Sequence, residues 1–265
     1  MSYPFLKGHG TENDFVVLPD ADGTIHGDAD GEMDAERVRA LCDRRAGIGG
    51  DGVLRAVRRD GGWFMDYRNA DGSVSEMCGN GVRVFARYLH DHEGEPFPMR
   101  IGTRAGVKVV DRSGDELTVD MGAPEVLGET SVSVMGRTWP ARHVSMGNPH
   151  AVAYVDNLAE PGPLVEPPEH DDGVFPEGVN VEFVVRRGEH HVTMRVHERG
   201  SGETRSCGTG ACAVAVATAL ADDAPRGTTY RVDVAGGTLH VVWTEDDRVL
   251  MTGPAVLVAR GETDL

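Results

Sequence analysis

The stretch Cys78-Gly79-Asn80-Gly81 occurs a second time in this 265-residue sequence, as Cys207-Gly208-Thr209-Gly210. The second copy lies about half a chain length after the first. Each copy follows a strand-like segment and precedes a segment with the composition of a helix. A four-residue match is weak by itself, so its weight depends on the residues around it.

The surroundings of the two copies also match. Asn69 and Glu198 stand at the same spacing before their cysteines, and each closes a strand-like segment. Residues 13–17, Asn-Asp-Phe-Val-Val, have a rough counterpart in residues 148–152, Asn-Pro-His-Ala-Val. This agreement predicts two homologous halves, 1–122 carrying Cys78 and 123–265 carrying Cys207, with a last strand that is free to return to the first half.

Local patterns predict a protein rich in strands with few helices. Short apolar runs bounded by Gly and Asp indicate strands at 15–18, 107–110, 181–185, 192–196 and 239–243. Three segments are typical of helices: 34–46 with Asp34 as its N-cap, 81–89 and 211–221. The last is apolar on every side, so we expect it to be buried all round, as inside a curved sheet.

Composition excludes several classes of function. A formal net charge of −17, with the acidic residues scattered, argues against binding to nucleic acid, which requires a basic face. No run approaches the roughly 18 apolar residues of a membrane span, and the first residues lack the apolar core of a signal peptide. We therefore expect a cytoplasmic protein with no membrane partner.

The four cysteines are expected to be free thiols. Cys42, Cys78, Cys207 and Cys212 include no C-x-x-C pair, which disfavours a zinc site or a thioredoxin-type redox site. Cys42 and Cys212 fall within predicted helices without a glycine loop, so we interpret both as buried structural residues. No metal site is expected.

Cys78 and Cys207 have a setting that favours chemistry. A helix N-terminus next to a sulfur lowers the pKa of the thiol, and flanking glycines let backbone N–H groups approach an anion such as a carboxylate. Two such halves would enclose one small ligand in a cleft between them. A thiolate on one side of a carbon and a thiol on the other suit inversion of a stereocentre. Lys7 and Lys108 are the only lysines and neither has a pyridoxal context, so no cofactor is expected.

Six motifs in order resemble those of diaminopimelate epimerases. They run from about residue 7 to residue 220, and they are 13–15 (Asn-Asp-Phe), 68–73 (Arg-Asn-Ala-Asp-Gly-Ser), 78–81, 147–150 (Gly-Asn-Pro-His), 178–180 (Gly-Val-Asn) and 198–204 followed by 207–210. The resemblance implies an α+β fold of two pseudo-symmetric halves, each a mixed sheet curled around a central helix. It also implies a homodimer that converts LL-2,6-diaminopimelate to meso-2,6-diaminopimelate in lysine and peptidoglycan-precursor biosynthesis.

The resemblance assigns roles to particular residues of this chain. Cys78 and Cys207 would be the catalytic acid/base pair, and His150 and Glu198 would adjust their protonation. The reacting carboxylate would be held by Gly79, Asn80, Gly208 and Thr209. The amino groups and the distal end of the substrate would be bound by Asn13, Asn69, Asn148, Asn180, Glu198 and Arg199. One departure is Gly52, where some members carry a glutamine that contacts substrate.

Three other readings are weighed against this one. Proline racemases also use two cysteines, but their first motif tends to be Cys-Gly-His-Gly, and here Asn80 replaces that histidine. A non-catalytic binding protein would not need both thiols. A thiol-disulfide redox protein would not need so many carboxylate-binding features.

Overall fold

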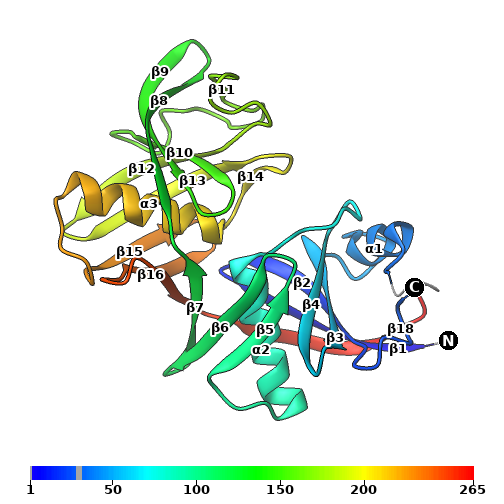
Figure 1. Ribbon diagram of the computed structural model, residues 1–265. Helices are drawn as coiled ribbons and strands as arrows, with labels where there is room; N and C mark the ends of the chain where they lie inside the picture. Colours follow the sequence, from blue (N-terminus) through cyan, green and yellow to red (C-terminus); the bar gives the residue numbers. More distant parts are fainter. Residues whose placement is uncertain (1, 28–31) are drawn as a thin grey trace. The chain divides into compact units, whose positions relative to one another are not determined.

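The computed structural model describes residues 2–27 and 32–265. It divides the chain into two units, which Figure 1 shows in colours that follow the sequence. The N-terminal unit comprises Met1–Val119 and Gly253–Leu265, and the C-terminal unit comprises Asp120–Thr252. The chain therefore leaves the first unit and returns to it for its last strand.

The N-terminal unit is a mixed sheet with two helices. Its strands are β1 Tyr3–Gly10, β2 Asn13–Pro19, β3 Gly52–Arg59, β4 Gly62–Asn69, β5 Met99–Thr103, β6 Gly106–Ser113, most of β7 Glu116–Gly122, and β18 Val256–Thr263. Its helices are α1 Ala35–Cys42 and α2 Gly79–Glu93. Strand β2 is parallel to β3 and β4 is parallel to β5, whereas β1–β2, β3–β4, β5–β6 and β6–β7 are antiparallel.

The C-terminal unit repeats this topology. Its strands are β8 Glu125–Val134, β9 Arg137–Ser145, β10 Pro149–Tyr154, β11 Glu169–His170, β12 Asn180–Gly188, β13 His191–Glu198, β14 Gly202–Thr204, β15 Thr229–Val234, β16 Gly237–Trp243 and most of β17 Val249–Gly253, and its helix is α3 Gly208–Ala221. Strand β10 is parallel to β12 and β13 is parallel to β15, whereas β9–β10, β12–β13, β15–β16 and β16–β17 are antiparallel. The order of parallel and antiparallel pairs is the same in the two units.

A central helix fills the curve of each sheet. Helix α2 contacts β1 to β6 and β18, and α3 contacts β9, β10, β12, β15 and β16. Helix α3 is buried from Gly210 to Ala219, because its Ala and Val side chains offer no polar face to water. The expected α+β fold, with a mixed sheet curled around a helix in each half, is confirmed.

The predicted N-cap of the first helix is confirmed, but the predicted bounds of the helices are partly wrong. Helix α1 ends at Cys42 rather than at residue 46, α2 spans Gly79–Glu93 rather than 81–89, and α3 begins at Gly208 rather than at residue 211, because α2 and α3 start directly after their capping cysteines. Asp34 caps α1 by accepting a hydrogen bond from the Glu36 N–H. Helix α1 stops at Cys42 because the Asp43 side chain accepts from the N–H groups of Arg45 and Ala46 and begins a new turn.

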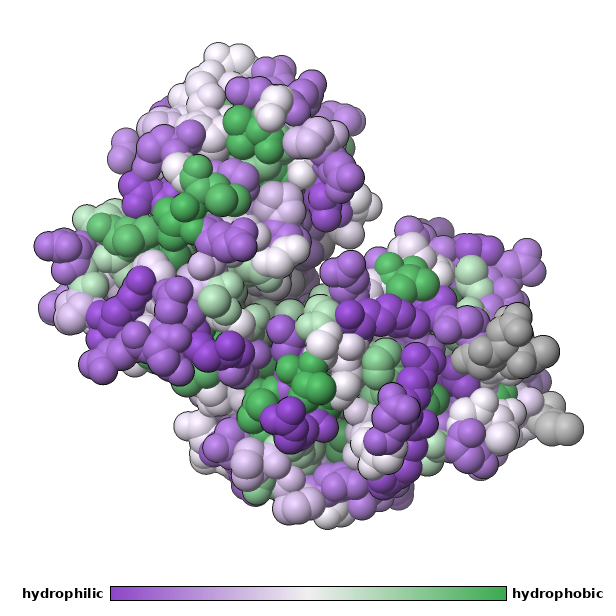
Figure 2. Space-filling view, viewed as in Figure 1, coloured by the Kyte–Doolittle hydropathy of each residue, from purple (hydrophilic) through white to green (hydrophobic). Residues whose placement is uncertain are grey.

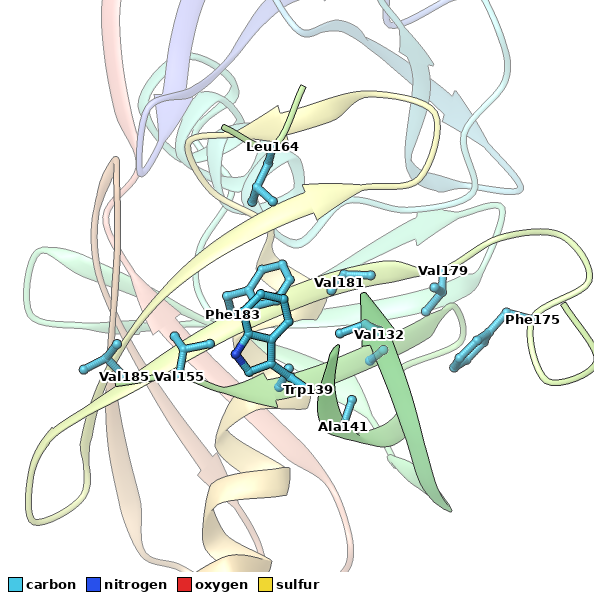
Figure 3. Close-up of a cluster of buried hydrophobic side chains, with 12 residues drawn as sticks. Val132, Trp139, Ala141, Val155, Leu164, Phe175, Val179, Val181, Phe183 and Val185 are labelled. Carbon is cyan, nitrogen blue, oxygen red and sulfur yellow. The ribbon is translucent and has the colours of Figure 1, made fainter. Parts of the chain in front are cut away.

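The outer face of the C-terminal sheet has its own apolar core. Figure 3 shows this cluster, in which the Trp139 and Phe183 rings meet edge to face at 5.4 Å between centroids. Val181, Phe183 and Val185 of β12 all belong to it. Since neighbouring strand residues point to opposite faces, Glu182 points to the other face, where α3 packs on β12.

The surface agrees with the composition. Figure 2 shows a mostly hydrophilic face on which apolar side chains form separate groups. Among the described residues, no helix is long and apolar enough to cross a membrane.

Candidate active site

Each of the two repeated cysteines is the N-cap of its unit's central helix. Cys78 precedes α2 and its Sγ accepts from the Gly81 N–H at 3.4 Å; Cys207 precedes α3 and its Sγ accepts from the Gly210 N–H, also at 3.4 Å. Both residues have extended backbone, as N-caps do. The duplicated sequence therefore builds the same local geometry twice.

Cys78 lies in a cluster of asparagine amides. The Cys78 thiol donates to the Asn13 side-chain oxygen at 3.5 Å, and the Asn80 amide donates to the same oxygen at 3.2 Å. Asn13 in turn donates to Asp51 at 2.8 Å. Asn13 and Asn80 are thus brought together with Cys78. Asn69 ends β4, where its amide donates to Ser73 Oγ at 3.0 Å.

Arg83 fixes the orientation of Asn80, and the sequence reasoning missed it. The fully buried Arg83 guanidinium donates to Asn80 Oδ1 at 2.8 Å, and also to the carbonyls of Gly79 and Pro254, each at 3.3 Å. Because Asn80 Oδ1 accepts from Arg83, its amide nitrogen faces Asn13. The signal that was available is the spacing of Asn80 and Arg83, which places both on one face of a helix.

Cys207 lies in a more acidic and more buried setting. Its Sγ is 3.5 Å from the Thr209 hydroxyl, and the Glu198 carboxyl group lies close enough for its charge to act on the thiol. Thr204 donates a hydrogen bond to Glu198. The predicted residues Glu198, Cys207 and Thr209 are therefore neighbours in the C-terminal unit.

His150 and the remaining asparagines of this unit are linked in a chain of hydrogen bonds. The Asn148 amide donates to Thr209 Oγ at 3.3 Å, and His150 Nε2 is 3.1 Å from Asn148 Oδ1. Asn180 donates to the Pro149 carbonyl at 2.9 Å and accepts from the Arg199 N–H at 3.0 Å. Arg199 itself is exposed, and its guanidinium donates to the Glu177 carbonyl.

The expectation that the helix start lowers the thiol pKa is wrong for Cys207. Burial raises the pKa of Cys207, and the charges of Glu198 and Glu182 add to the rise, whereas the hydrogen bonds from Thr209 and the Gly210 N–H oppose it only in part. Burial also raises the pKa of Glu198. In this state Cys207 is a thiol that carries its proton.

Cys42 and Cys212 have the environment of structural residues. Both are buried, and burial raises the pKa of Cys42 to about 11. Among the described residues, no group of three or more His, Cys, Asp or Glu side chains has the arrangement of a metal site.

The absence of a side chain at residue 52 has a steric reason. A Cβ added to Gly52 would lie 2.5 Å from the Arg68 carbonyl oxygen and 2.7 Å from the Tyr67 ring. A glutamine at this position would require β4 to move away from β3, because Gly52 of β3 is paired with Asn69 of β4.

We predict that Gly52→Ala lowers the free energy of unfolding by about 1–3 kcal/mol, the usual cost of forcing extra atoms into packed structure. Gly62→Ala is the matched control in the adjacent strand, because its nearest neighbour would be the Arg59 carbonyl oxygen at 4.0 Å. Urea unfolding of both variants measures the difference. Equal free energies of unfolding for the two variants would show that β4 moves aside without loss of stability.

The fold defines a class of two-unit proteins that includes solved structures from other organisms. A phenazine biosynthesis protein of the PhzF family from Bacillus anthracis has a TM-score of 0.73 and 17% identity, with 100% of both chains covered. A hydroxyproline epimerase from Agrobacterium vitis has a TM-score of 0.68 and 15% identity, with 99% of this chain and 92% of the other covered. At these identities the likeness establishes the fold.

The sequence identifies the family within this class. The diaminopimelate epimerase family model matches residues 5–127 and 142–258. The chain is 56% identical to a diaminopimelate epimerase of Streptomyces coelicolor, covering 98% of this chain and 95% of the relative. It is 44% identical to one of Corynebacterium glutamicum, covering 100% and 99%. The chain belongs to the diaminopimelate epimerase family.

Proposed function

We propose that this chain interconverts LL- and meso-2,6-diaminopimelate without a cofactor, with Cys78 and Cys207 as the acid/base pair. The observation that carries the proposal is the duplicated cysteine N-cap, together with family membership over nearly the whole chain. Both stereochemical directions need an acid and a base, and the two units each supply one thiol in the same local geometry.

The chemistry balances with one thiolate and one thiol, and one proton moves on each face of the substrate carbon. A thiolate removes the proton from the α-carbon, so that a C–H bond breaks and an S–H bond forms. The electron pair left on carbon is delocalised into the substrate carboxylate. The opposing thiol then delivers its proton to the other face and becomes the thiolate. Cys207, which holds its proton in this structure, is suited to the donor role.

The first turns of α2 and α3 are suited to hold the reacting carboxylate. Backbone N–H groups at a helix start stabilise the negative charge that develops there, and the residues that would supply them are Gly79, Asn80, Gly208 and Thr209. The amino groups and the distal carboxylate would be bound by the side chains of Asn13, Asn69, Asn148, Asn180, Glu198 and Arg199. His150 and Glu198 would adjust the protonation of the thiols.

The pathway and the cellular setting complete the proposal. The product would serve lysine synthesis and peptidoglycan precursors, and we place the enzyme in the cytoplasm as a homodimer. Family membership and the composition of the chain support these points.

The experiment is incubation of the purified protein with LL-diaminopimelate in D₂O. We expect the meso isomer to form with one deuterium at the inverted carbon. L-Proline is the matched control substrate, because it would leave the polar groups for the distal end unpaired, at a cost of about 1–3 kcal/mol each. Proline turnover at a comparable rate, or inversion without deuterium in the product, would overturn the proposal.

A further inference from the structure

The strand registers show which residues of the two units are equivalent. In the N-terminal unit Phe15 pairs with Gly52, and Val53 pairs with Arg68. In the C-terminal unit His150 pairs with Asn180, and Val181 pairs with His197. By this register, Phe15 of the N-terminal unit is equivalent to His150 of the C-terminal unit. Two residues further along the next strand, Leu54 is equivalent to Glu182.

The space around Gly81 and Gly210, in the first turns of α2 and α3, shows which side chains lie beneath each helix start. A Cβ on Gly81 would meet Leu54 Cδ2 at 3.2 Å and the Phe15 ring at 3.6 Å. A Cβ on Gly210 would meet Glu182 Oε1 at 2.6 Å and Cys207 Sγ at 3.3 Å. The start of α2 thus lies over two apolar side chains, whereas the start of α3 lies over a carboxyl group.

Glu182 forms a fully buried pair with His150. Both side chains have no exposed surface, and His150 Nδ1 is 2.7 Å from Glu182 Oε1. The second carboxyl oxygen, Glu182 Oε2, has no hydrogen-bond partner among the described residues. An ionised carboxylate with an unpaired oxygen is costly to bury, and burial accordingly raises the pKa of Glu182.

Hydrogen-bond directions place two protons on the pair, one on His150 Nε2 and one between His150 Nδ1 and Glu182 Oε1. The Asn148 amide nitrogen donates to Thr209, so its oxygen faces His150 Nε2, which must donate. A second proton must lie between His150 Nδ1 and Glu182, because two bare acceptors would repel at 2.7 Å. The pair is therefore either an imidazolium with a carboxylate or an imidazole with a carboxylic acid, and its net charge is zero.

Stability does not account for a charged residue at this position. The other described residues of β12 from Val181 to Val185 are apolar and buried, and the N-terminal unit fills the equivalent position with Leu54. Replacing a buried polar pair by apolar side chains is often neutral or stabilising. Burying this polar pair costs free energy, and no gain in stability offsets that cost. This indicates a role in the chemistry of Cys207.

We propose that Glu182 is a positioning residue for the second thiol: it holds the proton-bearing ring of His150 beneath the start of α3, so that only the helix start that carries Cys207 lies over a buried proton-sharing pair. The proposal rests on the proposed use of Cys207 as an acid/base group. The proposal adds a carboxyl group that does not contact the substrate. This group acts through His150 and the start of α3.

Other titratable groups that face the pair are on neighbouring strands. Glu198 of β13 lies close enough to Cys207 and His150 for a charge–charge interaction, and His143 of β9 lies equally within range of His150. His197 of β13 is buried next to Val181. Each is left unchanged in the variants below, so a difference reports on Glu182.

The test is Glu182→Gln, which keeps the size of the side chain and removes its ionisation. We expect kcat for diaminopimelate to fall by about tenfold to a hundredfold with KM nearly unchanged, because the change affects proton transfer and not substrate contacts. Glu129→Gln is the matched control, since Glu129 lies on the exposed face of β8 in the same unit and pairs with Arg142.

A second readout requires no substrate. Iodoacetamide alkylation of Cys78 and Cys207, followed by peptide mass spectrometry as a function of pH, gives a midpoint for each thiol. Because Glu182 and His150 share a proton beneath the start of α3, Glu182→Gln should move the Cys207 midpoint and leave that of Cys78 in place. An unchanged Cys207 midpoint, or equal movement of both, would overturn the proposal.

Nitrogen NMR of the wild-type protein covers the case in which the variant does not fold. With ¹⁵N-labelled histidine, we expect the signal of a protonated nitrogen for His150 Nε2, because Nε2 donates to Asn148 Oδ1. An Nε2 atom without a proton would contradict this arrangement of protons on His150 and Glu182. If the wild type fails to epimerise diaminopimelate, the proposed function fails, whereas the alkylation and NMR results still decide the role of Glu182.

Discussion

Cys78→Ala and Cys207→Ala are each expected to lower kcat/KM for diaminopimelate by about a thousandfold or more, since inversion needs a proton removed from one face and delivered to the other. Neither alanine can exchange a proton. The measurement is conversion of LL- to meso-diaminopimelate, with circular dichroism to show that each variant is folded. A folded variant that keeps near-normal activity would refute the assignment of Cys78 and Cys207 as the acid/base pair.

The other two cysteines serve as matched controls. Cys42 ends α1 and packs in a core cluster with Val38 and Leu41, and Cys212 is fully buried in α3. Cys42→Ala and Cys212→Ala remove a small apolar side chain and should lower stability without lowering kcat. A loss of activity as large as that of Cys78→Ala, in either folded control, would show that thiol chemistry is not confined to the repeated motif.

The repeated motif predicted the local structure around the two cysteines correctly because its information is local. Cys78 and Cys207 are N-caps, and the polar residues Asn69 and Glu198 end their strands as expected. A Cys-Gly-x-Gly sequence after a strand needs few other residues to specify a helix start. The all-apolar composition of α3 likewise required a surrounding sheet.

The electrostatics of the site depended on residues far apart in sequence and could not be predicted in the same way. The pKa of Cys207 is set by burial and by carboxyl groups from two other strands, so the helix start alone gave the wrong direction. Glu182 offered one signal, a single acidic residue within an apolar strand. Its partner His150 lies on β10, and only the parallel pairing of β10 with β12 brings the two together.

Gly210→Ala is expected to lower activity by about a hundredfold, because an added Cβ would lie 2.6 Å from Glu182 Oε1 and 3.3 Å from Cys207 Sγ. A displacement of about 1 Å at a reacting group is enough for such a loss. Displacing the buried carboxyl should also lower the free energy of unfolding by about 1–3 kcal/mol. Activity assays and urea unfolding of the same preparation measure both effects.

Gly81→Ala is the control that separates this contact from a general effect of alanine in the first helical turn. Both glycines lie three residues after their cysteine in a helix, and alanine favours a helix over glycine by up to about 1 kcal/mol at either position. At Gly81 the Cβ would meet the Leu54 methyl group at 3.2 Å, and a side-chain end can shift by a few tenths of an ångström. We therefore expect Gly81→Ala to keep most of its activity and stability. Equal losses in the two variants would mean that both helix starts tolerate no side chain whatever lies beneath them, and that the carboxyl beneath the start of α3 has no special sensitivity.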